Sequence, residues 1–183
     1  MRIDKLFQVE KASAKEPGRY AMNSVKFERD CAAMNGPALI ATDGRVLAMV
    51  PVAADDADAD GLIPREAFSE ARRGAFKRSP DVEIVANGSV KFMGKLGPME
   101  LQRADAEFPR YGDLAAKALK QTPAIVVGLN PAFLLALAQA IGIDERNPAV
   151  SLAITSADKP IIVRVVRTGA QGVGIIMPHN VSV

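Results

Sequence analysis

One pattern occurs twice in this chain and limits what it can fold into. A Gly-Leu-x-Pro sequence at residues 61–64 and again at 128–131 opens a helix-like stretch, and a β-prone segment follows at 81–85 and at 149–153. Proline suits the first turn of a helix, because its missing N–H would have no partner there. The repetition predicts a fold built from copies of one small unit.

Turn signals extend each copy. Asn130 is a favourable helix N-cap, and Gly74 and Gly142 stand where glycine often ends a helix. Asn87-Gly88 separates two β-prone runs, as in a tight hairpin. Residues 39–49, with Asp43-Gly44 at their centre, align with residues 83–93 and indicate an earlier copy without its helix.

The unit is therefore strand–helix–strand–strand–strand, present about three times with the first copy degenerate. We predict an α+β fold of repeated β-α-β-β-β units, with antiparallel sheets and helices on one face. The acidic residues 53–60 are expected to form a surface loop, and residues 112–123 a linker. Two domains follow from this division, one over residues 1–112 and a half-domain over residues 122–183.

Composition narrows the classes of function. The chain has 23 basic and 21 acidic residues, so a DNA-binding role requires its positive charge to be concentrated on one face. One cysteine, Cys31, excludes a disulfide within the chain, and with the single histidine, His179, it argues against a zinc site. With no leader and no apolar run of roughly 20 residues, we expect a cytoplasmic protein without a membrane span.

Four short stretches carry a resemblance to a known family. They are Arg-Tyr-Ala-Met-Asn-Ser-Val at 19–25, Ala-Thr-Asp-Gly-Arg-Val-Leu-Ala at 41–48, Phe-Pro-Arg-Tyr at 108–111 and Ile-Ile-Met-Pro at 175–178. In this order, and laid over an internal repeat, they resemble the bacterial DNA sliding clamp, the β subunit of the replicative DNA polymerase. The resemblance implies a DNA-clamp-like fold.

The resemblance covers most of the chain but not the whole of a clamp. Residues 19–111 resemble the middle clamp domain without its opening helix, and residues 124–179 resemble the second half of the last domain. The family's first domain has no counterpart, so the chain looks like a shortened relative. The hairpin reads Arg45-Val46 where the family has His-Arg, and residues 179–183 replace the family's basic ending.

The resemblance implies a processivity factor that binds or encircles double-stranded DNA without sequence specificity and tethers a DNA polymerase or other partners. The DNA contacts are expected from the basic helix that begins after residue 64. Its alternative role is an ordinary solvated face with Glu66 and Glu70 as ion-pair partners. The helix at 131–141 has no basic residue and is expected to be buried under a sheet or against another subunit. The candidate DNA-binding residues are Arg65, Arg72, Arg73, Lys77 and Arg78.

In the family, partners dock short peptides in an apolar pocket between the middle and last domains. The matching positions lie on the first hairpin and the last strand, and a flexible methionine suits such a groove. The alternative is that Leu47, Ile176 and Met177 are core residues. The candidate peptide-pocket residues are Thr42, Gly44, Arg45, Leu47, Ile175, Ile176, Met177 and Pro178.

No phosphate-binding loop, nucleophile motif or paired carboxylates on a helix are found, so we expect no enzyme activity, no cofactor and no metal site. A clamp-fold interaction module that does not encircle DNA is the alternative function. Family rings contain twelve of these units, so three units per chain predict a homotetramer, with a dimer or monomer left open.

Overall fold

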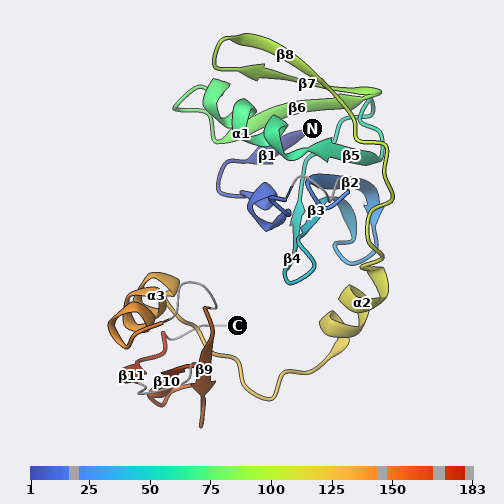
Figure 1. Cartoon of the computed structure of the whole chain (residues 1–183). Helices are drawn as coiled ribbons and strands as arrows, with labels where there is room; N and C mark the ends of the chain where they lie inside the picture. The colour runs from blue at the N-terminus through green and yellow to red at the C-terminus, as the bar shows by residue number, and fades with distance from the viewer. Residues whose placement is uncertain (17–20, 144–147, 167–171, 180–183) are drawn as a thin grey trace. The chain divides into compact units, whose positions relative to one another are not determined.

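The computed structural model describes residues 1–16, 21–143, 148–166 and 172–179. The chain divides into two compact units, Met1–Lys120 and Gln121–Val183, and each is described by itself. Figure 1 shows the order of the elements along the chain. Arg19 and Tyr20 of the first resemblance stretch lie outside the described residues, as do residues 180–183 of the ending.

The first unit contains eight strands, two α-helices and one short 3-10 helix, η1, among its described residues. Every strand pairing in it is antiparallel. The elements are β1 (Arg2–Asp4), η1 (Val9–Ala12), β2 (Ser24–Cys31), β3 (Gly36–Thr42), β4 (Leu47–Pro51), β5 (Gly61–Pro64), α1 (Arg65–Gly74), β6 (Asp81–Asn87), β7 (Ser89–Gly94), β8 (Gly97–Gln102) and α2 (Gly112–Lys120).

Two four-stranded sheets exchange a strand with each other. Their strand orders are β4-β3-β2-β5 and β1-β6-β7-β8. Strand β5 leads directly into α1 but pairs with β2, with Val25 opposite Ile63. Strand β1 leads into η1 but pairs with β6, with Ile3 opposite Val82. Each half of the unit therefore completes the sheet of the other half, and neither sheet is whole alone.

A single core joins the two halves. The inner faces of both sheets contribute fully buried side chains, among them Phe27 and Ile84, and α1 adds Phe68. In β6 and β7 the buried positions alternate with exposed ones, as expected of sheets with one solvated face. Burial of each large side chain of this kind stabilises the fold by about 1.5–3 kcal/mol.

Helix α1 begins after residue 64 and ends at Gly74, as expected, and its Phe68 and Ala71 are buried. The glycine at its end has a different role from the predicted cap. Gly74 is the last helical residue, and a Cβ there would lie 2.0 Å from the carbonyl oxygen of Met93 in β7. Gly74 therefore permits close packing of helix on strand, whereas Gly142 does have a positive φ of 89°.

The predicted alignment of residues 39–49 with residues 83–93 is wrong, because it matches two turns that join different pairs of strands. The Asn87-Gly88 turn joins β6 to β7, but the Asp43-Gly44 turn joins β3 to β4. By position in the two sheets, β3 corresponds to β7 and not to β6. Tight turns look alike in sequence wherever they occur in a sheet, so the local match misled the alignment. The short helix η1 takes the place of the helix expected to be missing.

The Phe-Pro-x-Tyr stretch covers the outer face of the first sheet. Phe108 and Tyr111 pack on a small buried cluster that includes Cys31 and Ile40, and their rings meet edge to face at 6.1 Å. The Tyr111 hydroxyl donates to a Glu28 carboxylate oxygen, and burial together with this bond raises the pKa of Tyr111 well above its ordinary value.

Residues 112–120, predicted as linker, form helix α2 instead. The helix begins where Ala115 N–H donates to Tyr111 O.

In the second unit, one helix packs on one face of a three-stranded sheet. The unit contains α3 (Pro131–Ala140), β9 (Val150–Ala153), β10 (Ile161–Val165) and β11 (Val173–Ile176), in the sheet order β11-β10-β9. The Asn130 side chain accepts a hydrogen bond from Ala132 N–H at 2.9 Å, which confirms the predicted N-cap. Ile161, Val163 and Ile176 form its buried core.

Helix α3 is not buried under the sheet of its own unit, and burial against another subunit, the other expectation, stays a prediction. Phe133 and Leu135 are 61% and 58% exposed, and only Ala138 among its residues is buried. Leu134 and Leu137 pack on the core of the unit. The uniformly apolar sequence suggested burial on all sides, but the three-stranded sheet of this unit covers only one face of the helix.

The acidic loop at residues 53–60 is exposed except at the half-buried Ala54 and at Asp58, whose side chain is 1% exposed. Asp58 Oδ2 lies 2.7 Å from the α-amino group of Met1, and Oδ1 accepts from Ala86 N–H at 3.0 Å. Burial opposes ionisation of Asp58, but these contacts and the Asp55 N–H outweigh it and hold the pKa of Asp58 below its ordinary value of 3.8. The loop thus anchors the start of the chain to β6.

We expect Asp58→Asn to lower the free energy of unfolding at pH 7 by roughly 2 kcal/mol, because hydrogen bonds to a charged group contribute about that much. Since the folded pKa of Asp58 is lowered, its contribution is present above pH 3.8 and is lost as the pH falls below that value. Urea denaturation between pH 7 and pH 2.5 should show the two proteins converging at the acid end. Asp56→Asn, at an exposed position of the same loop, is the matched control and should change little at any pH.

Candidate functional site

Two of the predicted DNA-binding arginines are held by the protein itself. Arg72 places Nε and Nη2 at 3.1 and 2.8 Å from the two carboxylate oxygens of Glu10 in η1, and also donates to the Lys5 and Phe7 carbonyls. Arg65 Nη1 donates to Ala14 O at 2.9 Å. Their guanidinium groups tie α1 to the N-terminal segment, so they position the helix and are not free toward a ligand.

The other three predicted cations are exposed at the end of α1. Arg73 pairs with Glu70 one turn earlier, with its side chain 65% exposed. Lys77 and Arg78 are exposed and form no ion pair with any residue in the described ranges. Cations at a helix C-terminus interact favourably with the helix dipole. This basic cluster of Arg73, Lys77 and Arg78 can contact phosphate without first losing a buried partner.

A cleft beside η1 adds two cations, Lys11 and Lys15, that the sequence analysis did not single out. It has a volume of about 640 Å³ and is lined by Lys11, Lys15 and Arg45, with Glu16 and Asp43 as its acidic residues. Helix α1 packs against η1. The cleft lies toward the start of α1, where Arg65 bonds to Ala14, and the basic cluster lies at the other end of the helix. Lys11 and Lys15 were missed because η1 is only four residues long and Lys15 lies beyond it, so no periodic pattern marks them in the sequence.

The predicted peptide-pocket residues of the first unit surround the Asp43-Gly44 turn. Thr42 Oγ1 donates to Val46 O at 2.6 Å and accepts from Gly44 N–H at 3.0 Å. Asp43 Oδ1 accepts from the Arg45 and Val46 N–H groups at 2.8 and 3.0 Å. These bonds, Val46 N–H first and then Arg45 N–H, lower the pKa of Asp43. They fix the turn and leave the Arg45 side chain exposed.

Leu47 is the apolar member of this group. It is half-buried and packs on the cluster of Cys31, Ala38 and Ile40. Leu47 therefore serves the local core with one side and keeps part of its surface accessible, which is compatible with the lip of an apolar groove.

The predicted pocket residues of the last strand alternate. Ile176 is buried and packs in the core of the second unit, in line with the alternative role considered for it. Ile175 and Met177 are exposed, and Pro178 is half-buried. The next residue, His179, donates its N–H to Gly128 O at 2.9 Å. The two halves of the predicted pocket lie in different units, and a joint pocket remains a prediction.

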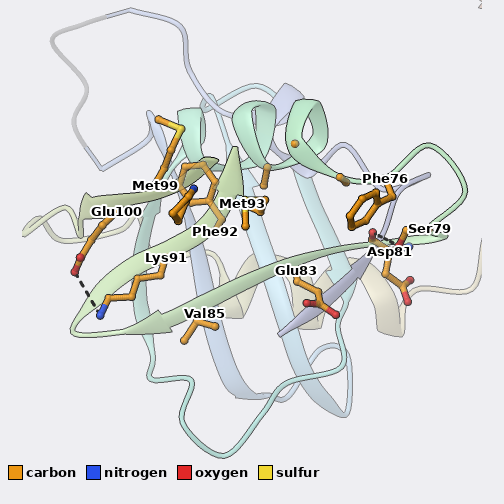
Figure 2. Close-up of a pocket in the computed structure, with 14 residues that line it drawn as sticks. Phe76, Ser79, Asp81, Glu83, Val85, Lys91, Phe92, Met93, Met99 and Glu100 are labelled. Atoms are coloured by element: carbon orange, nitrogen blue, oxygen red, sulfur yellow. Dashed lines mark hydrogen bonds and ion pairs between the residues drawn. The ribbon is translucent and has the colours of Figure 1, made fainter. Parts of the chain in front are cut away.

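A larger cavity lies elsewhere in the first unit. It has a volume of about 680 Å³ and runs from the end of α1 across β6, β7 and β8. Figure 2 shows Phe76, Ser79 and Asp81 at one end of it, Met99 and Glu100 at the other, and Lys91 ion-paired with Glu100. None of the predicted DNA or peptide residues lines it, and its acidic side chains are the wrong sign for phosphate.

The described residues offer no group of three or more His, Cys, Asp or Glu side chains that could hold a metal ion. Within the same residues, none of the helices combines the length and apolar character of a membrane span. The candidate site thus consists of the exposed basic cluster, the basic cleft and the fixed hairpin turn, and its exposed cations can contact an anionic partner.

The fold is that of the bacterial β sliding clamps, and this confirms the resemblance and the fold class predicted from the sequence. DNA polymerase III subunit β of Pseudomonas aeruginosa superposes on 97% of this chain with a TM-score of 0.72 at 17% sequence identity, over 50% of its own length. The Caulobacter crescentus β sliding clamp matches 97% of this chain and 50% of its own, with a TM-score of 0.68 and 19% identity.

A sliding clamp from Bartonella birtlesii, bound to griselimycin, matches the whole of this chain and 51% of its own length, with a TM-score of 0.67 and 20% identity. This chain therefore spans about half the length of the clamps it matches. No protein-family model matches the sequence, and no curated protein matches it. The likeness lies in the three-dimensional structure and establishes a clamp-fold protein.

The different placements of Arg72 and Arg73 predict different effects on stability. Arg72→Met should lower the free energy of unfolding by about 3 kcal/mol, because it leaves the largely buried Glu10 carboxylate without its partner. Arg73→Met removes an exposed pair and should change it by less than about 1 kcal/mol. Urea denaturation at pH 7 measures both. Equal effects would contradict the assignment of Arg72 as a structural residue.

Proposed function

We propose that this chain is a sliding-clamp-like processivity factor that binds double-stranded DNA without sequence specificity and tethers a DNA polymerase or another DNA-processing partner. The clamp fold over nearly the whole chain is the observation that carries this proposal. Non-specific DNA binding rests on contacts between basic side chains and phosphates. The alternative, a clamp-fold interaction module without DNA affinity, shares the fold and differs in that property.

The charges of the first unit support the DNA-binding half of the proposal. Arg73, Lys77 and Arg78 are exposed at the end of α1, and Lys11 and Lys15 line the cleft beside η1. The remaining cations of this layer, Arg65 and Arg72, position the helix. Helix α3 carries no basic residue, so the DNA surface belongs to the first unit and further copies are needed to surround a duplex.

The peptide-binding half of the proposal rests on two exposed groups. Arg45 and the accessible side of Leu47 flank the fixed turn in the first unit, and Ile175 and Met177 project from the end of the second. Apolar side chains beside a flexible methionine suit the docking of short peptides. Griselimycin is bound by two of the matching clamps, from Bartonella birtlesii and Pseudomonas aeruginosa, and is a ready probe for such a site.

DNA binding can be tested with two unrelated duplexes of equal length at increasing salt. We expect equal affinity for both and a steep loss with salt. The triple variant Arg73→Glu, Lys77→Glu, Arg78→Glu should bind at least roughly tenfold more weakly with a shallower salt slope. The control reverses three other exposed cations, Lys95, Lys159 and Arg164, for the same change in net charge. Absence of any DNA binding at low salt would leave the interaction module as the function.

Peptide binding can be tested by calorimetric titration with griselimycin. Met177→Lys should weaken binding by roughly tenfold or more, because a charge replaces an exposed apolar contact of the proposed groove. Val85→Lys, at an exposed apolar position on the outer face of β6, should leave the affinity unchanged. If the parent protein binds nothing, or if both variants bind as it does, the proposed groove is wrong.

A further inference from the structure

The first unit shows what a finished unit of this fold requires. The strand before each helix pairs not with its own half but with the central strands of the other half, as β5 does with β2 and β1 with β6. The result is two four-stranded sheets around one core. A half without its partner therefore has a sheet that is one strand short. The strand before its helix has no sheet to join.

The second unit is such a half. Its sheet has three strands, and β9, the counterpart of β6, has no described partner on its outer side. The segment before α3, residues 124–129, reads Ala-Ile-Val-Val-Gly-Leu, which favours a strand. Its residues 125–127 pair with no strand in the part of the chain that the structure describes. One strand is missing and one is unused, as the first unit leads one to expect.

A comparison of the two helices shows that α3 also lacks part of the packing that α1 has. Aligning Pro64 with Pro131 places Phe68 of α1 opposite Leu135 of α3. Phe68 is 1% exposed, in the core that both sheets share, whereas Leu135 is 58% exposed. More than half of the large exposed apolar side chains of the described chain lie in the second unit, which holds about a third of its residues. The side of α3 that carries Leu135 is therefore the side that a second half would bury.

We propose that two copies of this chain associate through their second units and complete each other. The segment 124–129 of each copy adds as an antiparallel strand to the β9 edge of the other, and the two α3 helices pack over a joint core. The product repeats, between two chains, the interface that the first unit has within one.

A second copy fits this surface better than another partner. The interface is its own complement, as a two-fold dimer requires, because each copy offers the strand that the other lacks. Helix α3 has no charged residue, so two of them meet without like-charge repulsion. Covering Leu135 alone removes only on the order of 100 Å² per copy, and the added strand and the joint core bring the contact toward the roughly 800 Å² that stable interfaces bury.

The association can be measured on the full chain by light scattering after size exclusion, without DNA. We expect a mass of twice the 19.4 kDa chain, or an even multiple of it, and half that mass for Leu135→Lys. Val173→Lys changes a residue of nearly equal exposure, 57%, on the outward face of β11 and should keep the parent mass. A monomeric parent protein at about 100 μM, or an unchanged mass for Leu135→Lys, would overturn the proposal.

Hydrogen exchange supplies a second measurement on the same proteins. The amides of residues 125–127 should exchange slowly in the parent protein at high concentration and quickly on dilution or in Leu135→Lys. Val126→Pro, which removes one donor from the added strand, should shift the dimer toward monomer while circular dichroism stays unchanged. Slow exchange that does not depend on concentration would indicate that the same chain covers the segment, and would contradict a second copy. Because no step involves DNA, this result stands apart from the DNA-binding test.

Discussion

The exchange of β1 and β5 between two half-sheets is the constraint on which the rest of the first unit depends. A sheet of three or four strands with one apolar face must bury that face against something. Here the two inner faces bury each other, with α1 and η1 closing the core. The exchanged strands join the halves by backbone hydrogen bonds as well as by packing. The position of α1, and of every cation on it, follows from this arrangement.

Burial then divides the basic residues of one short helix into two roles. Arg72 faces the N-terminal segment and meets the Glu10 carboxylate and two carbonyls, so its charge stabilises the fold. Arg73, the next residue, is turned by about 100° around the helix and faces solvent. A binding surface for a polyanion needs cations whose partners are water and not buried carboxylates. The proposed DNA surface is therefore smaller on α1 than the sequence suggests and extends toward η1.

Much of the fold was predictable because its signals are local. The two Gly-Leu-x-Pro starts, the N-cap at Asn130 and the Asn87-Gly88 turn each depend on a few neighbouring residues, and the structure confirms them. The predictions that failed concern partners distant in sequence. The burial of Asp58 in a loop expected at the surface depends on Met1 and Ala86. The exposure of α3 within its own unit follows from the lack of a second sheet there, and its burial against another subunit stays a prediction. The helical character of residues 112–120 was hidden by a composition that suits a linker equally well.

The sequence by itself determined the repeated unit, its helices and turns, the apolar character of α3 and the family that the chain resembles, because periodicity and turn chemistry act over a few residues. Only the tertiary structure decided which sheet each strand joins, which arginines are free and which apolar residues remain exposed. Those outcomes depend on strand pairing and side-chain packing between segments as far apart as Ile3 and Val82, or Glu10 and Arg72. No local pattern records such pairings, because their free energy comes from burying surfaces that the chain brings together only when it folds.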